Sequence, residues 1–232
     1  MRLRTYFLIA AVYCLVYLGM QHNLAHQTMV SAQTPISIII DAGHGGEDGG
    51  TVSREGVRES EINLSISHKL DYILAFCGMR TVMIRTDDSA VHAEGASVRE
   101  RKVSDLKNRV NLVNGIDPAV LISIHQNHFA EPKYHGAQVF YSASGGSKEL
   151  ASGIQNTLRT ALDPANQRLC KPADTVYLLE QCRCTGVLIE CGFLSNPQEA
   201  QLLQTQDYQK KIVCAIAGGL AQFLEEGKRN EI

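Results

Sequence analysis

Three short apolar runs in this chain each end in a histidine or a carboxylate. Residues 36–40 (ISIII) lead into the glycine-rich loop DAGHGG, residues 120–124 (VLISI) precede His125, and residues 187–189 (VLI) precede Glu190. Runs of this length that are rich in β-branched residues are typical of strands buried on both faces of a sheet. Such strands need helices on both faces to cover them, and this requirement leaves few fold classes open.

The segments between these runs have the spacing of amphipathic helices. Residues 61–76 place apolar side chains three or four positions apart, residues 101–114 repeat the pattern, and a glycine follows each segment. Strands are expected at residues 36–41, 81–84, 119–125, 137–141, 175–179 and 186–190, and further helices at 148–162, from 197 and at 208–224. The alternation predicts a single α/β domain with a mostly parallel central sheet and helices on both faces.

The first 34 residues differ from the rest of the chain. Arg2 and Arg4 precede an uncharged apolar stretch at residues 6–20, which is the layout of an export signal and is shorter than the roughly 20 residues of a membrane span. The protein is therefore expected outside the cytoplasm, secreted or membrane-associated. An ordinary buried helix is the alternative for this segment, and its cleavage is left open. We predict a signal or membrane-targeting segment with its linker at residues 1–34, the folded domain at 35–227 and a polar tail at 228–232.

The composition disfavours several classes of function. The formal net charge is -2 and no block of lysine and arginine occurs, which argues against a nucleic-acid binder. Tryptophan is absent and the aromatic residues are scattered, which disfavours an aromatic platform for sugars. Cys170, Cys182 and Cys184 lie close in sequence, and a disulfide among them is compatible with export. Their pairing is left open.

The polar residues at the strand ends form a candidate zinc site. Parallel strands bring their carboxyl ends to one edge of a sheet, where open α/β proteins place their active sites. His44 and His125 follow two such strands, and the glycines around His44 leave space for a bulky group to approach. Glu59 lies just before a predicted helix, and Glu190 ends a third strand. A hydrolytic zinc ion needs three protein ligands and one open position, and a further group must move a proton, so these four residues supply a complete set.

Neighbouring residues compete for two of these roles. Glu61 is the alternative to Glu59, although a carboxylate in the first turn of a helix is also favoured by the helix dipole. His128 follows His125 at helical spacing, but the preceding strand favours an exposed loop at this point.

Other polar residues near the motifs have two interpretations each. Asp41 precedes His44 by three positions, and it either orients the ligands or caps the loop. Arg85 follows the second predicted strand; it either lines the groove or belongs to a solvated turn, which is the interpretation that we adopt. His135 either borders the cleft or is simply exposed.

Four segments of the chain resemble the motifs of a known enzyme family. They are DAGHGG at residues 41–46, GVRESEINL at 56–64, SIHQN at 123–127 and VLIECGFLSN at 187–196. Together, and in this order, they resemble the zinc-dependent N-acetylmuramoyl-L-alanine amidases of the Amidase_3 type, and the resemblance spans residues 36–224. Two positions depart from the family pattern, because Ser60 stands where lysine is usual and Cys191 where valine is common.

The resemblance implies a fold, a cofactor and a reaction. The fold would be the α/β zinc-hydrolase sandwich. His44, Glu59 and His125 would bind Zn²⁺, and Glu190 would be the catalytic carboxylate. The reaction would be hydrolysis of the amide between the lactyl group of N-acetylmuramic acid and L-alanine in peptidoglycan. The alternatives are a zinc peptidase that acts on wall peptides and a non-catalytic wall-binding protein.

The chain also resembles one branch of this family, the germination-specific spore-cortex amidases of the CwlD type. Residues 136–141 (GAQVFY) are similar to the corresponding strand in that branch. The resemblance implies a role in muramic δ-lactam formation in the spore cortex. No wall-binding module is visible in the sequence, so we expect targeting to depend on the membrane-directed N-terminal segment or on an activating or targeting protein partner.

Overall fold

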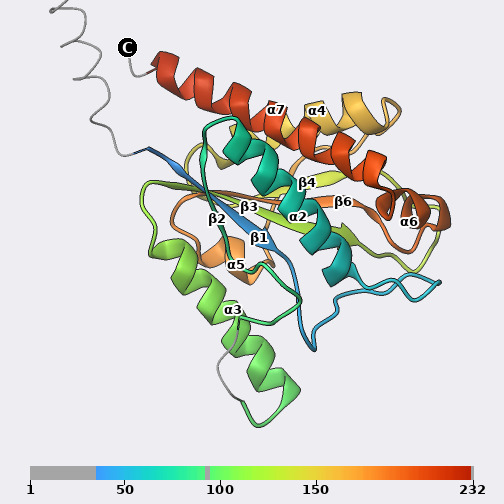
Figure 1. The fold of residues 1–232 in the computed structure, drawn as a ribbon. Helices are drawn as coiled ribbons and strands as arrows, with labels where there is room; N and C mark the ends of the chain where they lie inside the picture. The colour runs from blue at the N-terminus through green and yellow to red at the C-terminus, as the bar shows by residue number, and fades with distance from the viewer. Residues whose placement is uncertain (1–34, 92–94, 231–232) are drawn as a thin grey trace, which may run out of the picture. The chain divides into compact units, whose positions relative to one another are not determined.

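The strands in the described part of the chain, residues 35–91 and 95–230 of the computed structural model, form one six-stranded sheet in the order β2-β1-β3-β6-β4-β5 (Figure 1). In chain order they are β1 (Ser37–Ala42), β2 (Arg80–Met83), β3 (Ala119–Asn127), β4 (Gln138–Tyr141), β5 (Lys171–Pro172) and β6 (Thr185–Phe193). Strands β2, β1, β3 and β6 run parallel, β4 is antiparallel to β6, and β5 is parallel to β4. The predicted mostly parallel sheet is confirmed, with β4 as the antiparallel exception.

Helices cover both faces of this sheet (Figure 1). On one face lie α2 (Glu59–Phe76), α4 (Ser147–Leu162) and α7 (Gln206–Asn230), on the other lie α3 (Val98–Asn114) and α5 (Tyr177–Gln181), and α6 (Pro197–Leu203) follows β6. Alternate side chains of β1 enter the two cores, since Ile38 and Ile40 pack on the first face and Ile39 packs on the second. The β-branched composition of β1 is thus explained by burial on both sides.

The carboxyl ends of β1, β3 and β6 meet at one edge of the sheet. Asp41 on β1 is in register with Ser123 on β3, and His125 on β3 is in register with Glu190 on β6. The predicted grouping of strand ends is therefore present, and it positions the candidate site.

One predicted element is wrong, and some boundaries move. The strand predicted at residues 175–179 is replaced by the short helix α5, which packs Leu178 and Leu179 into the second core. A short apolar run has no periodicity that separates a strand from a helical turn, so packing decides between them. Helix α3 begins earlier than predicted because Ser97 and Glu100 form a capping box at its start.

The predicted segments at the two ends of the chain stay predictions. Residues 1–34, the predicted export segment and linker, lie outside the described residues. Helix α7 continues to Asn230 and so includes the first residues of the predicted polar tail. Within the described ranges, no helix has both the length and the apolar character needed to cross a membrane.

Helices α4 and α7 approach each other closely at Gly219. A Cβ atom at this position would lie 2.8 Å from Cα and 2.9 Å from N of Ile154, and main-chain atoms cannot rotate aside. The adjacent Gly218 is exposed, and a Cβ atom there would meet nothing within 4 Å. The close contact between α4 and α7 therefore requires a glycine at position 219 but not at position 218.

Alanine substitutions at these two glycines should shift stability in opposite directions. We expect Gly218→Ala to stabilise the protein by up to about 1 kcal/mol, because alanine favours a helix over glycine. We expect Gly219→Ala to destabilise it by about 1–3 kcal/mol, since the added methyl group forces α4 and α7 apart. Urea unfolding, monitored by circular dichroism, measures the change in the free energy of unfolding of both variants. A shift of both variants in the same direction would contradict the close contact.

Candidate active site

Three side chains from different elements converge at this edge of the sheet. His44 lies in the loop after β1, Glu59 is the first residue of α2, and His125 lies near the end of β3. One ligand atom of each lies within 4.8 Å of the others, and no other such group of histidine, cysteine and acidic residues occurs within the ranges that the structure describes. The two imidazole rings meet edge to face, with their centroids 5.0 Å apart. Two nitrogen donors and one oxygen donor could hold a metal ion here.

Glycines around His44 make room for the other ligands. A Cβ atom at Gly43 would lie 2.2 Å from the ring of His125, and one at Gly50 would lie 2.6 Å from Oε2 of Glu59. We predicted that these glycines leave space for a bulky group that approaches from outside. The structure shows that the side chains of the site themselves occupy this space.

Glu59 is held in place by hydrogen bonds from three directions. Its Oε1 accepts from the backbone N–H of Gln126 at 3.0 Å, and its Oε2 accepts from that of Thr51 at 3.0 Å. Oε1 also lies 3.0 Å from Nδ1 of His125 and 3.3 Å from Nε2 of His44. Burial raises the pKa of Glu59, but the contacts with the two histidines outweigh it and hold the pKa below its usual range. The carboxylate is therefore ionised and fixed.

The alternative carboxylate is turned away from the site. Glu61 is exposed and does not belong to the group of converging ligand atoms. Two residues along an α-helix correspond to a rotation of about 200°, so Glu59 and Glu61 point to nearly opposite sides of α2. The geometry favours Glu59, which is the first residue of the helix and does not precede it as we predicted.

Glu190 lies beside the group, on the strand next to His125. Its Oε2 is buried and has no hydrogen-bond partner among the described residues. Burial raises the pKa of Glu190 to about 7, and the charge of Glu59 adds to this effect while the histidines oppose it. A carboxyl group with such a pKa can accept a proton and return it near neutral pH.

Three of the four residues line one cleft, and Glu59 lies buried behind them. Helix α3 forms one wall and the segment that leads into α5 forms the other, around a cavity of about 340 Å³. Its lining includes His44, His125 and Glu190, together with Lys102, Leu106 and Arg109 from α3 and Thr175, Val176 and Tyr177 from the opposite wall. Three of the four predicted site residues thus face a space that a substrate can enter.

Sequence reasoning missed the group that contacts the ring of His44. Asp48 lies four residues further on, and its Oδ2 is 3.0 Å from Nδ1 of His44. Burial lowers the pKa of His44, but the hydrogen bonds to Asp48 and Glu59 outweigh it and raise the pKa to about 9. The second acid of the loop GHGGED was the only signal in the sequence, and it resembles an ordinary loop residue.

The structure decides between the interpretations of two other residues. Asp41 is buried and contacts Arg109 and the hydroxyl of Ser123, and Arg109 in turn holds the carbonyl of His44, so these contacts favour the orienting role of Asp41 over capping of the loop. Arg85 is 4% exposed, and it donates to the carbonyls of Ala42, Gly43 and Ser60. The interpretation of Arg85 as part of a solvated turn is therefore wrong.

The remaining candidates lie outside the group. His128 and His135 are exposed, and Nδ1 of His135 lies 3.4 Å from a carboxylate oxygen of Asp163. Cys170, Cys182 and Cys184 are present as free thiols.

Comparisons with known proteins identify the family of this chain. The model of the Amidase_3 family, described as N-acetylmuramoyl-L-alanine amidase, matches residues 38–222. The germination-specific N-acetylmuramoyl-L-alanine amidase of Bacillus subtilis (strain 168) is 36% identical over 191 residues, which cover 82% of this chain and 80% of that protein.

Solved structures extend the similarity to the fold. The structure of the CwlD amidase from Clostridioides difficile in complex with the GerS lipoprotein has a TM-score of 0.79 and 40% identity, and the match covers 82% of this chain and 98% of that chain. An N-acetylmuramoyl-L-alanine amidase from Clostridium difficile 630 has a TM-score of 0.73 and 31% identity, with coverage of 82% and 97%. The predicted fold class and the resemblance to the CwlD type are confirmed.

The two glutamates at the start of α2 can be separated by their effect on metal binding. We expect Glu59→Ala to abolish stoichiometric zinc binding, because the anionic donor between the histidines is lost. Glu61→Ala should bind zinc like the unaltered protein, since its side chain points elsewhere. Elemental analysis and titration against a chelating dye measure both. Loss of zinc only in Glu61→Ala would show that the assigned ligand is wrong.

Proposed function

Since this chain belongs to the Amidase_3 family and is an N-acetylmuramoyl-L-alanine amidase that acts on peptidoglycan, we propose that His44, Glu59 and His125 hold a catalytic zinc ion. We also propose that Glu190 accepts the proton of the attacking water molecule. The convergence of these three ligand atoms beside a buried carboxyl group is the observation that supports the proposal best.

The donor set fits zinc. Two imidazoles and one carboxylate are a common ligand set of hydrolytic zinc sites, which leave one position open. His44 and His125 line a cleft, so a substrate can reach that position. Bound zinc would polarise the scissile carbonyl and lower the pKa of a water molecule to about 7.

Asp48 would fix the orientation of the first ligand. When it accepts a hydrogen bond from Nδ1–H of His44, the neutral ring keeps Nε2 free as a donor to a metal. Nε2 is the nitrogen that faces Glu59, at 3.3 Å. The ring is therefore oriented with its free nitrogen toward the other ligands.

Glu190 would act as general base and then as general acid. It accepts a proton from the attacking water molecule, whose oxygen forms a new bond to the amide carbon. When the C–N bond breaks, Glu190 returns the proton to the nitrogen of L-alanine. The products are a free lactyl carboxylate on the sugar and a peptide with a free amino terminus. The raised pKa of Glu190, about 7, suits both proton transfers.

We also propose that the substrate is the peptidoglycan of the spore cortex. The supporting observations are the similarity to the germination-specific amidase of Bacillus subtilis and to the CwlD amidase of Clostridioides difficile. The latter was solved in complex with the GerS lipoprotein, so we propose that a lipoprotein also binds this chain. An amidase of the cell wall acts outside the cytoplasm, and residues 1–34 would direct the protein there.

The role of Glu190 can be tested by replacing the carboxylate with an amide of the same shape. We expect Glu190→Gln to keep its zinc and its fold but to lose hydrolysis by a factor of about 10²–10⁴, because the amide cannot accept the proton of water. Mass spectrometry of the fragments released from spore-cortex and vegetative peptidoglycan, with and without zinc and any lipoprotein partner, measures the rate and the bond that is cleaved.

Glu180→Gln is the matched control, because Glu180 is an exposed glutamate on the neighbouring helix α5. It should release fragments that begin with L-alanine at the normal rate. Near-normal turnover by Glu190→Gln would place the general base elsewhere. Fragments that begin at another residue, with the lactyl amide intact, would favour the zinc-peptidase alternative. Binding of peptidoglycan that needs no zinc and is not followed by cleavage would favour a wall-binding protein.

Export can be tested with a reporter that is active only outside the cytoplasm. We expect a fusion of residues 1–35 to such a reporter to be active, because two arginines precede an uncharged apolar stretch. Replacement of Leu8 and Leu15 by aspartate within that stretch should abolish the signal, whereas aspartate at Gln27 in the polar linker should not. A reporter that stays inactive in the unaltered fusion would contradict the targeting role.

A further inference from the structure

Helix α3 has little apolar surface in contact with the rest of the protein. Arg109 and Val113 are the only buried residues in this fully described 17-residue helix, whereas Val98, Val103 and Leu112 are exposed. In Figure 1 its N-terminal turns extend beyond the sheet. Val110 and Val113 pack in the second core, so hydrophobic burial is confined to the C-terminal half of α3, and the N-terminal half makes polar contacts with the domain.

The polar contacts of α3 concentrate on the loop that carries His44. Arg109 is 2% exposed, and its Nη2 donates to the carbonyl of His44 at 2.7 Å while Nη1 donates to the carbonyl of Ala42 at 3.0 Å. Nη1 also contacts the carboxylate of Asp41, and Nε donates to Asp105 at 2.7 Å. A planar guanidinium can make all these bonds at once, which an ammonium group cannot do.

The loop needs such contacts because its backbone is strained. His44 has a φ of 62° and is the only non-glycine residue with positive φ in the ranges that the structure describes. A conformation of this kind costs on the order of 1–3 kcal/mol and persists only when its surroundings fix it. Arg85 holds the preceding carbonyls of Ala42 and Gly43, at 2.8 and 3.1 Å. Arg109 holds the carbonyl of His44 itself, from the side of α3.

The same contacts connect β1, which leads into the loop of His44, with β3, which carries His125. Asp41, which Arg109 contacts on β1, accepts a hydrogen bond from the hydroxyl of Ser123 at 2.6 Å. Ser123 lies on β3, two residues before His125. The position of Arg109 therefore affects both histidines of the site.

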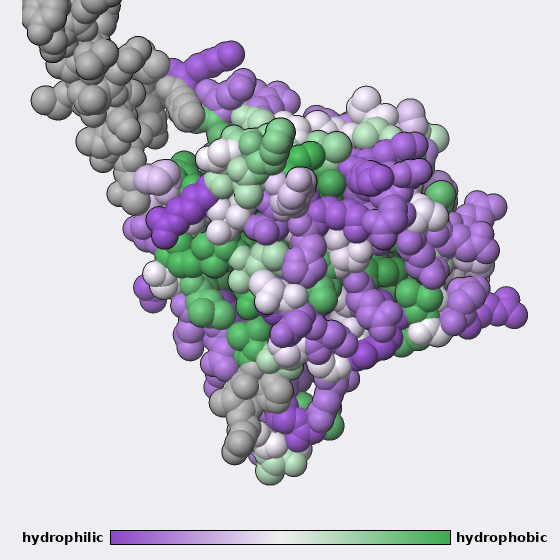
Figure 2. Space-filling view, in the orientation of Figure 1, coloured by the Kyte–Doolittle hydropathy of each residue, from purple (hydrophilic) through white to green (hydrophobic). Residues whose placement is uncertain are grey.

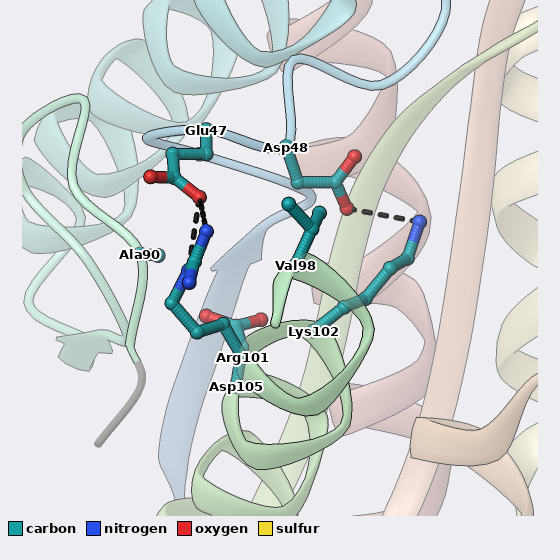
Figure 3. A pocket seen from close by; sticks show the side chains of 8 residues that line it. Glu47, Asp48, Ala90, Val98, Arg101, Lys102 and Asp105 are labelled. Carbon is teal, nitrogen blue, oxygen red and sulfur yellow. Dashed lines mark hydrogen bonds and ion pairs between the residues drawn. The ribbon is translucent and has the colours of Figure 1, made fainter. Parts of the chain in front are cut away.

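A second contact joins α3 to Asp48, the residue that contacts the ring of His44, and Figure 3 shows the pair of Lys102 and Asp48. Nζ of Lys102 lies 3.1 Å from Oδ2 of Asp48, and the same oxygen lies 3.0 Å from Nδ1 of His44. Arg101, one residue earlier on the helix, pairs with Glu47 at 2.6 Å. Lys102 is 53% exposed, so this contact is screened by solvent and weaker than that of Arg109.

We propose that Arg109 is a positioning residue that fixes His44 as a metal ligand and thereby couples helix α3 to the affinity for zinc. This inference rests on the proposed zinc site. Because coupling between two parts of a protein is reciprocal, zinc bound at His44 must also stabilise the contact of α3 with the domain. A residue that served only to hold the fold together would not produce this reciprocal effect.

The test uses the full-length protein with Arg109→Lys, which keeps the charge but loses the planar fork. We expect its zinc affinity, measured by competition with a chelating dye, to fall at least about tenfold, since tenfold corresponds to about 1.4 kcal/mol. Arg99→Lys is the matched control, because Arg99 is an exposed arginine on the same helix. Its zinc affinity should be unchanged. Urea unfolding of both variants and of the unaltered protein without zinc measures the free energy of unfolding, so that a loss of stability is distinguished from a loss of zinc affinity.

Hydrogen exchange supplies a second readout that needs no variant. In the unaltered protein, zinc should slow the exchange of amides in α3 but not in α4, on the opposite face of the sheet. Normal zinc affinity in a folded Arg109→Lys would overturn the inference. If that variant does not fold, zinc-independent exchange in α3 of the unaltered protein would overturn it instead. Failure of the unaltered protein to bind zinc at all would refute the proposed zinc site, which is a distinguishable result.

Discussion

The buried carboxylate of Glu59 is the interaction on which the rest of the site depends. An ionised carboxylate removed from water is costly unless several donors surround it. Here the donors come from three separate parts of the chain: the loop before α2 through Thr51, the end of β3 through Gln126, and α2 itself through Asn63, which donates at 3.2 Å. Since both histidines also contact this carboxylate, its burial fixes how the β1 loop, α2 and β3 meet.

Around Glu59, the loop of His44 is held by hydrogen bonds and ion pairs of charged side chains. The face of the molecule in Figure 2 is mixed, with apolar residues interspersed among polar ones. The side chains of Asp41, Arg85 and Arg109 are buried. Arg85 and Arg109 hold successive carbonyls of one strained loop, and Asp41 and Asp105 balance the charge of Arg109. Such a network fixes geometry more than it adds stability, because buried ion pairs gain little net free energy over apolar packing.

Sequence patterns predicted the parts of the fold and site that have local signals. The runs before His125 and Glu190 marked buried strands, and the direction of parallel strands placed both residues at one edge. The run at residues 175–179 was too short for its periodicity to be informative, and it forms a helix. Arg109 could not be found in this way, because it contacts His44 across 65 positions and lies in a helix whose polar pattern resembles a solvated face.

The two glutamates of the site show why residue type alone cannot assign a role. Glu59 is buried, Glu190 is half-buried, and both lie close to the same histidines, yet their pKa values move in opposite directions. Glu59 accepts hydrogen bonds on both oxygens and stays ionised, as a metal ligand must. Glu190 has a buried oxygen without a partner among the described residues, so burial dominates and its pKa rises to about 7. The difference between the proposed metal ligand and the proposed proton carrier therefore follows from the number of donors around each carboxyl group, and the register of β3 and β6 brings Glu190 beside His125.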